Sequence, residues 1–319
     1  MANAKNPKIA VVIPCHNEEP TVGKVIDDFQ RQIPSAVVYV FDNCSTDATA
    51  KTAQQHGAVV IKESRKGKGF VVERIFDCVD ADFYLIVDGD DTYSASYANQ
   101  LLEPVINGDA DMAVGARLEK YTENSFRPLH VFGNNLVRWL VNRLTGARLT
   151  DIMSGYRAFN RRVVERIPVV SAGFEIETEL TLQMLYYKFN IIEITVPYQQ
   201  RPAGSTSKLR TFHDGFRILW KIFSLFRALK PLTFFGSVGL VLGVFGILAG
   251  LVPIREYIMN PDHYISHVPL AILATGLIIL SCGSIFLGIL LHSLNWRFLE
   301  LHNVLTRRHS RGKDTGIHK

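Results

Sequence analysis

The sequence predicts an α/β domain with a mostly parallel sheet, followed by an amphipathic helix and two transmembrane helices. Apolar, strand-like runs alternate with helical patterns from residue 8 to about residue 115, which is typical of a parallel sheet covered on both faces. Two long runs without charged residues follow in the last third of the chain. With 319 residues and 47% apolar composition, the chain can bury one sizeable core and still leave a second segment.

The elements of the domain follow from periodicity and from turn residues. Period-2 and continuous apolar runs predict strands at residues 9–13, 37–41, 58–61, 83–87 and 112–115. Helical spacing predicts helices at residues 20–32, 47–56, 69–79 and 94–106. Beyond residue 121 the alternation loosens, and we expect a helix at 128–144, a polar turn at 151–157 entering a strand, a helix opening near 173–179, and a strand at 191–198.

Three carboxylates, those of Asp88, Asp90 and Asp91, directly follow the fourth predicted strand. Asp88 and Asp90 are two residues apart, so in an extended segment they point the same way, and Gly89 between them permits a close approach by phosphate. Neighbouring carboxylates repel one another unless a cation lies between them, and Mg²⁺ or Mn²⁺ accepts such oxygen ligands. The pattern indicates a divalent-metal site, and a solvated Asp/Gly turn is the alternative.

Polar residues also follow the other predicted strands. Ligands of open α/β sheets bind beyond the carboxyl ends of the strands, where the strand order reverses. Those ends carry Pro14, His16, Asn17 and Glu18 after the first strand, Asp42, Asn43, Ser45 and Asp47 after the second, and Arg117 after the fifth. The chain contains no GxGxxG or GxxxxGK[ST] segment, so the dinucleotide and P-loop interpretations lack their phosphate-binding turns.

Two basic segments could bind phosphate. Residues 66–69, Lys-Gly-Lys-Gly, are a weak candidate for a phosphate nest, and an exposed loop is the favoured interpretation. Residues 201–208 suit a diphosphate better, because Arg201 and Lys208 supply charge while hydroxyl and backbone N–H groups supply hydrogen bonds. A plain linker remains the alternative there.

Acidic residues open the helix near 173–179. Glu175, Glu177 and Glu179 lie near its positive N-terminus, so they serve either the helix dipole or the site.

The last third of the chain predicts a membrane hairpin. Residues 231–254 and 268–291 contain no charged side chain, and each run is long enough to cross ~30 Å of hydrocarbon. Basic residues gather before the first run and after the second, so the positive-inside rule predicts a two-pass protein with its catalytic domain and both termini in the cytoplasm. No cleavable signal peptide is expected. Glycines at three- and four-residue steps in the first run allow close helix packing, within the chain or in a homo-oligomer.

Charge and cysteine usage agree with this placement. The net charge of +5 is gathered beside the membrane, where anionic lipid attracts it, so no nucleic-acid partner is needed to explain it. The four cysteines show no metal-ligand spacing and are expected to be reduced thiols.

Residues 213–230 form an amphipathic helix in this prediction, with aromatic residues on one face and basic residues on the other. Such a helix lies in the membrane interface, and packing on the domain is the alternative. The expected domains are a cytoplasmic catalytic domain over 1–211, this juxtamembrane helix over 212–230, the transmembrane hairpin over 231–292 and a basic cytoplasmic tail over 293–319.

Seven segments, in order, resemble glycosyltransferase family 2, and within it the polyprenyl-phosphate glycosyltransferases related to dolichyl-phosphate mannose synthase. They are VVIPCHNEE, FDNCSTD, VDGDD, GAR, DIMSGYRAF, GFEIETE and RPAGSTSK. The resemblance implies a GT-A fold, a nucleotide-sugar donor, a divalent cation and a lipid phosphate acceptor.

The resemblance also implies roles for single residues. Asp42 would contact the nucleotide base, Arg201 and Lys208 would hold the diphosphate, and Arg117 with Arg127 would face the acceptor phosphate. The expected catalytic residues are Asp90, Arg117 and Arg127, and the expected metal ligands for Mg²⁺ or Mn²⁺ are Asp88 and Asp90. The expected nucleotide-sugar-binding residues are Pro14, Asn17, Glu18, Asp42, Asp88, Glu175, Arg201 and Lys208.

Three features depart from the family pattern or limit it. Asp42 is followed by Asn43 where many relatives have two acids, and Asp91 stands where dolichyl-phosphate mannose synthases commonly carry another residue. The QxxRW signature of processive synthases is missing, so a single transfer is favoured.

The expected reaction is an inverting, metal-dependent transfer of a hexose or N-acetylhexosamine from a UDP-sugar to undecaprenyl or dolichyl phosphate at the cytoplasmic membrane face. A lipid phosphate is already an anion at neutral pH, so the attack needs no dedicated base. A sugar nucleotidyltransferase is one alternative, although the first strand is not followed by the Gly-rich basic loop that it would need. A non-catalytic, membrane-tethered nucleotide-sugar binder is the other.

Overall fold

The computed structural model describes residues 7–118, 128–173, 175–199 and 211–314. Contacts divide the chain into two units, Met1–Ile222 and Phe223–Lys319, and the division falls inside one helix.

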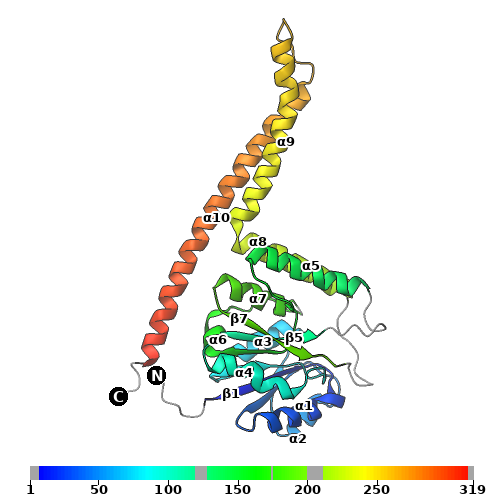
Figure 1. Ribbon diagram of the computed structural model, residues 1–319, viewed down its shortest axis with the longest axis vertical. Helices are drawn as coiled ribbons and strands as arrows, with labels where there is room; N and C mark the ends of the chain where they lie inside the picture. The colour runs from blue at the N-terminus through cyan, green and yellow to red at the C-terminus, as the bar shows by residue number, and fades with distance from the viewer. Residues whose placement is uncertain (1–6, 119–127, 174, 200–210, 315–319) are drawn as a thin grey trace. The chain divides into compact units, whose positions relative to one another are not determined.

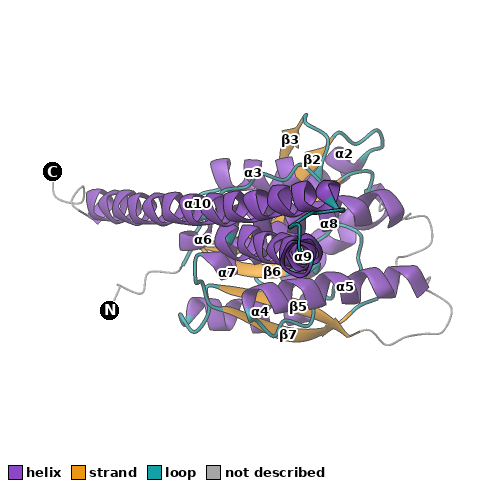
Figure 2. Ribbon diagram, turned by 90° about the horizontal axis from the view of Figure 1, so that it is seen from above, coloured by secondary structure: helices purple, strands orange, loops and turns teal. Residues whose placement is uncertain are grey.

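The first unit contains a seven-stranded, mostly parallel sheet, which confirms the predicted fold class. The strands lie in the order β3-β2-β1-β4-β6-β5-β7, and Figure 2 shows β3 and β2 at one edge and β5 and β7 at the other. Only β6 runs antiparallel to its neighbours, β4 and β5. The strands are β1 Ile9–Cys15, β2 Val37–Asn43, β3 Val59–Glu63, β4 Phe83–Ile86, β5 Met112–Leu118, β6 Arg157–Asn160 and β7 Ile191–Pro197.

Helices cover both faces of this sheet (Figure 1). One apolar cluster joins β1 to α1 and α4, and a second joins the opposite side of β1 to α3, α6 and α7. The helices are α1 Glu19–Gln32, α2 Thr49–Gln55, α3 Lys68–Cys78, α4 Ala98–Ile106, α5 Pro128–Thr145, α6 Arg161–Arg166 and α7 Ile176–Tyr186.

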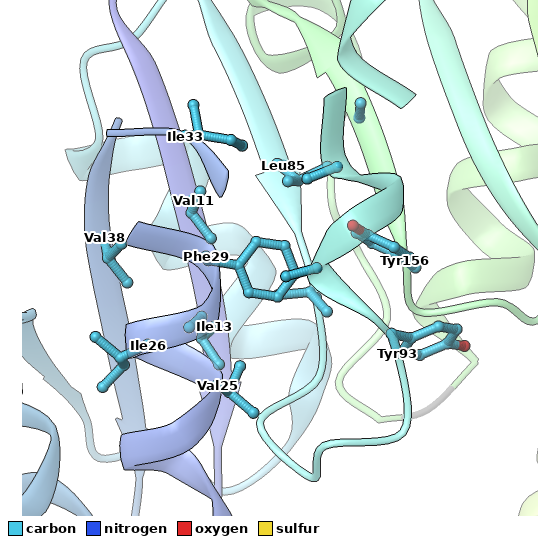
Figure 3. Packing of buried hydrophobic residues seen from close by; sticks show 14 of the residues in the cluster. Val11, Ile13, Val25, Ile26, Phe29, Ile33, Val38, Leu85, Tyr93 and Tyr156 are labelled. Atoms are coloured by element: carbon cyan, nitrogen blue, oxygen red, sulfur yellow. The ribbon is translucent and has the colours of Figure 1, made fainter. Parts of the chain in front are cut away.

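The cluster beneath α1 shows how the sequence pattern produces this packing. Val22, Val25, Ile26 and Phe29 recur at helical spacing and are all buried. The ring of Phe29 meets Tyr156 edge to face, with 6.0 Å between the ring centroids (Figure 3). One helix face is thereby fixed against β1 and the segment before β6.

Two local differences separate the structure from the sequence prediction. The short helix α6 was not predicted, because six residues are too few to show a helical period. Asn160 caps it, since its side-chain oxygen accepts a hydrogen bond from Val163 N at 3.2 Å. The helix expected from residue 94 begins with a 3₁₀ turn, Ala95–Tyr97, before α4.

Helix α8, Thr211–Leu229, packs in part on the domain, which was the alternative interpretation of its sequence. Ile218 and Ile222 are buried, and Lys221 Nζ lies 3.0 Å from Glu179 Oε2 in α7. Phe216 and Trp220 instead stay 68% and 60% exposed. The lysine-bearing side of the helix therefore packs on the domain while two aromatic side chains remain uncovered.

The second unit contains α9, Pro231–Met259, and α10, Val268–Asp314. By length and composition, Pro231–Met259 and Val268–Leu301 are each able to cross a membrane. Ser281 Oγ donates a hydrogen bond to Gly239 O at 2.6 Å, and a Cβ on Gly246 would lie 2.9 Å from Ile278 Cδ1. The glycine spacing of the first run thus serves close packing between these two helices of one chain.

Candidate active site

The strand order reverses at β1, which has the parallel strands β2 and β4 on its two sides. Val12 pairs with Ile86, and Val87 N donates a hydrogen bond to Val12 O at 3.2 Å. The carboxyl ends of β1 and β4 therefore lie side by side at a topological switch point, where ligands of such sheets bind. This brings Pro14, which pairs with Phe41 of β2, close to the acidic turn after β4.

The acidic turn is held from both sides. Asp90 is only 2% exposed, and its Oδ1 accepts hydrogen bonds from Thr92 N at 3.2 Å and Thr92 Oγ1 at 2.5 Å. Thr21 Oγ1 donates to Gly89 O at 2.7 Å. A Cβ at Gly89 would lie 2.5 Å from Cys15 Sγ, so only glycine fits between the two strand ends.

Asp91 has a separate role from its two neighbours. Its φ of 58° is left-handed, and its Oδ1 lies 2.6 Å from Lys24 Nζ of α1. This lysine neutralises Asp91 on the side of α1, which leaves Asp88 and Asp90 as the carboxylates of the proposed metal site.

Lys68 supplies a cation at the acidic turn. Its Nζ lies 2.5 Å from Asp88 Oδ1 and 2.6 Å from Glu177 Oε1, and only 11% of its side chain is exposed. Burial alone would lower the pKa of Lys68, but the charges of Asp88 and Glu177 raise it above its ordinary value. The ammonium therefore stays charged between the two carboxylates.

The expectation that residues 66–69 form an exposed loop is wrong for Lys68. The segment instead opens α3 and lies beneath the backbone of Ser171 and Ala172. Gly69 N donates to Ala172 O at 3.0 Å, and a Cβ on Gly69 would lie 1.8 Å from Ser171 O. The two glycines were the sequence signal for this close cover, because no larger residue fits there.

The donor set fits a divalent ion that shares its coordination with a substrate. Within the described part of the chain, no group of three or more His, Cys, Asp or Glu residues is arranged to hold a metal. Asp88 already faces a cation, the ammonium of Lys68. Mg²⁺ is commonly bound by one or two carboxylates together with substrate phosphates, so Asp88 and Asp90 match a site completed by a diphosphate.

Arg117, which was expected at the site, is paired with Asp151. Arg117 Nε lies 2.7 Å from Asp151 Oδ2, and Nη2 lies 3.0 Å from Oδ1. Burial alone would raise the pKa of Asp151, but the hydrogen bonds and charge of Arg117 lower it. The two parallel hydrogen bonds fix the orientation of the guanidinium at the end of β5.

Other predicted residues join loops around the site. Asn17 N donates to Ser45 Oγ at 3.0 Å, and its Oδ1 accepts from Thr46 N at 2.7 Å. Asp42 is buried at the end of β2, where its Oδ1 accepts from Ser45 N at 3.3 Å. The two hydrogen bonds of Asn17 tie the loop after β1 to the loop after β2.

Two predicted acids lie at helix starts. Glu18, buried before α1, donates its backbone N–H to Thr49 Oγ1 at 2.9 Å. Glu175 precedes α7, and its Oε1 accepts from Gly173 N at 3.2 Å.

Three predicted residues, Arg127, Arg201 and Lys208, lie outside the described residues. The structure does describe the residues just before Arg201, up to residue 199. Tyr198 forms an antiparallel bridge with Tyr93, and Gln199 N donates to Thr92 O at 3.0 Å. This segment therefore runs beside the residues that directly follow the acidic turn.

Arg157, which the sequence did not mark as functional, is the largest fully buried side chain among the described residues of the domain. Its Nε and Nη2 donate to Ser154 O at 2.8 Å and Ile152 O at 2.6 Å. Burial lowers its pKa. Arg157 is the first residue of β6, and its two hydrogen bonds to backbone carbonyls hold the loop at 152–155.

Comparisons with known proteins agree with this geometry. The family described as Glycosyl transferase family 2 matches residues 10–168. The glycosyltransferase AglJ of Haloferax volcanii is 31% identical over 88% of this chain and 92% of the relative. The dolichyl-phosphate hexose transferase of the same organism is 32% identical over 65% of this chain and 89% of the relative.

The fold is also found among solved structures. Glucosyl-3-phosphoglycerate synthase from Mycobacterium tuberculosis, in complex with Mn²⁺, UDP-glucose and phosphoglyceric acid, matches with a TM-score of 0.57 and 20% identity. The match covers 69% of this chain and 80% of that one, and it supports the GT-A-like fold of the domain.

Proposed function

The chain belongs to glycosyltransferase family 2, and from this premise we propose that it transfers a sugar from a nucleotide sugar to polyprenyl phosphate. The observation that carries the proposal is the acidic turn with Asp88 and Asp90 at the switch point of the sheet. The dolichyl-phosphate hexose transferase among its relatives supports the lipid acceptor. The sugar would be a hexose or N-acetylhexosamine, carried on undecaprenyl or dolichyl phosphate.

The donor would be a UDP-sugar whose diphosphate completes the cation site. Asp88 and Asp90 would hold Mg²⁺ or Mn²⁺, which when bound neutralises the charge that develops on the departing nucleoside diphosphate. Asp42, buried at the end of β2, would contact the nucleotide base. The same ligand would also meet Pro14 near the end of β1 and Asn17 in the loop after it. Glu18 and Glu175 would contact it from the starts of α1 and α7.

The diphosphate would also meet basic side chains. Arg201 and Lys208 follow the segment that pairs with Thr92 and Tyr93, so the chain needs to extend only a short way to reach the acidic turn. Charge-assisted hydrogen bonds from these side chains would stabilise the leaving diphosphate as the sugar carbon departs from it.

The acceptor needs positive charge more than it needs a base. A polyprenyl phosphate is already ionised, so its oxygen can displace the nucleotide directly, and a single displacement inverts the sugar carbon. Arg117, oriented by Asp151, would offset the repulsion between the two anions together with Arg127.

The lipid acceptor requires a protein that meets a membrane. Lys230 alone separates α8 from α9, the first helix able to cross a bilayer. The exposed Phe216 and Trp220 of α8 would lie at the lipid headgroups, with the domain and both chain ends in the cytoplasm.

A transfer assay tests the proposal. The detergent-solubilised chain is incubated with radiolabelled UDP-sugars, Mn²⁺ and polyprenyl phosphate, and the lipid is then extracted. Label that moves into the lipid phase with one donor, and only when polyprenyl phosphate is present, is the expected result. Tight UDP-sugar binding without labelled lipid would instead favour a non-catalytic nucleotide-sugar binder. Label released as sugar 1-phosphate when pyrophosphate is added would indicate a nucleotidyltransferase.

A further inference from the structure

Lys68 lies where a bound divalent ion would compete with it. Its ammonium is 2.5 Å from Asp88 Oδ1, one of the two carboxylates assigned to the cation, and 2.6 Å from Glu177 Oε1. Two positive charges cannot share one carboxylate closely without mutual repulsion, and that repulsion is strong where water is excluded.

The surroundings keep Lys68 in this position. Gly67 and Gly69, on either side of it, are covered by backbone carbonyls of Ala172 and Ser171 at distances that no Cβ would allow. A Cβ on Gly155 would lie 3.0 Å from Lys68 Nζ, so the loop before β6 closes the other side. The backbone of Lys68 is thus fixed, and only its flexible side chain can change partner.

We propose that Lys68 couples cation binding to donor binding at the acidic turn. Before the donor arrives, Lys68 neutralises Asp88 and weakens its attraction for a divalent ion. The donor diphosphate brings new negative charge, which gives Lys68 an alternative partner and leaves Asp88 to the cation. The inference rests on the proposed function, because the diphosphate is that of the nucleotide-sugar donor.

This coupling has a reciprocal consequence. If a diphosphate strengthens Mn²⁺ binding by some factor, Mn²⁺ must strengthen diphosphate binding by the same factor. Removal of the Lys68 charge should therefore tighten Mn²⁺ binding in the absence of nucleotide and reduce the enhancement that nucleotide gives. Removal of the Glu177 charge should instead weaken Mn²⁺ binding. Without Glu177, Lys68 pairs with Asp88 alone and the site loses a negative charge.

The test measures free Mn²⁺ by electron paramagnetic resonance for the full chain in detergent, with and without UDP. For Lys68→Met we expect Mn²⁺ alone to bind about tenfold more tightly than to the wild type, with a smaller gain on adding UDP. For Glu177→Gln we expect weaker Mn²⁺ binding. Lys51→Met, at an exposed lysine of α2, is the control and should behave as the wild type.

The outcomes separate this inference from the function on which it rests. If the wild type binds Mn²⁺ in the presence of UDP, and Lys68→Met and Glu177→Gln bind it with the same affinities, the coupling is wrong. The assignment of the donor site is then unaffected. No Mn²⁺ binding to the wild type, even with UDP, overturns both. Should Lys68→Met fail to fold, Glu177→Gln decides the matter alone, since unchanged Mn²⁺ affinity in that variant contradicts the coupling.

Discussion

Gly155 leaves room for the carboxylate of Asp88, since a Cβ at position 155 would lie 2.4 Å from Asp88 Oδ2. The loop that carries Gly155 is held by Arg157, whose guanidinium donates to two of its carbonyl oxygens. Residues on two distant segments therefore shape the acidic turn together, and this contact explains the glycine in the DIMSGYRAF segment.

Gly155→Ala should displace the Asp88 carboxylate while leaving the fold intact. We expect Mn²⁺-dependent sugar transfer to fall by at least about tenfold, because small displacements of positioned groups carry large rate costs. Transfer rate and thermal unfolding are measured together. The control is Gly283→Ala in α10, because a Cβ on Gly283 would have no neighbouring atom within 4 Å. Equal activity of the two variants would contradict the role given to Gly155.

The pair of Arg117 and Asp151 should make stability depend on pH. Because the folded-state pKa of Asp151 is lowered, its stabilising contribution is present above its ordinary value of 3.8 and is lost as pH falls below that value. Asp151→Asn leaves a buried guanidinium without its carboxylate and should cost about 3 kcal/mol near neutral pH.

Thermal unfolding of the full chain in detergent, between pH 6 and pH 3, measures this effect. The difference between wild type and Asp151→Asn should narrow as pH falls, whereas Asp77→Asn, at an exposed aspartate of α3, should change little at any pH. A difference that stays constant down to pH 3 would show that Asp151 is not stabilised as an anion.

Lys221→Met should destabilise the packing of α8 on α7. Glu179 is fully buried, and although Val170 N and Ser171 N also donate to it, Lys221 supplies the charge that balances it. Loss of that charge should cost about 3 kcal/mol of stability. Lys51→Met, at an exposed lysine of α2, is the control for thermal unfolding, and equal midpoints for the two variants would rule out the assigned role of Lys221.

The fluorescence of Trp220 should show whether α8 lies at the membrane interface. In a Trp139→Phe, Trp296→Phe background, Trp220 is the remaining tryptophan of the chain. After reconstitution into nanodiscs, lipids brominated near the headgroup should quench its fluorescence more strongly than lipids brominated near the chain end. Fluorescence unaffected by either lipid would place Trp220 in water and reject the interface helix.

Much of the site could be predicted from the sequence, because its main signal is local. A short apolar run followed by three carboxylates marks both the strand and the turn within nine residues, Tyr84 to Thr92. The parallel sheet then determines which loops meet there. The paired roles of Lys68 with Glu177 and of Arg117 with Asp151 could not be predicted in this way, since each joins segments far apart in the chain.

The C-terminal helices show the same limit of prediction from sequence. Charge-free runs indicate α9 and α10 from composition alone, but which face of α8 packs depends on tertiary partners. The sequence predicts that the basic residues of this helix lie on its polar face, and the structure buries most of Lys221 because Glu179 lies opposite. A basic residue on a helix face therefore predicts exposure to solvent only where no buried acid lies opposite it.

The most direct test of the account compares Mn²⁺-dependent sugar transfer to polyprenyl phosphate by Asp90→Asn and Asp91→Asn, both purified and folded. Asp90 lies buried in the proposed cation site, whereas Asp91 pairs with Lys24. We predict that Asp90→Asn loses ~100-fold or more in rate, about 3 kcal/mol of stabilisation of the leaving diphosphate, while Asp91→Asn stays within a few-fold of wild type. Near-wild-type transfer by Asp90→Asn would contradict the assignment of the acidic turn as the cation and donor site.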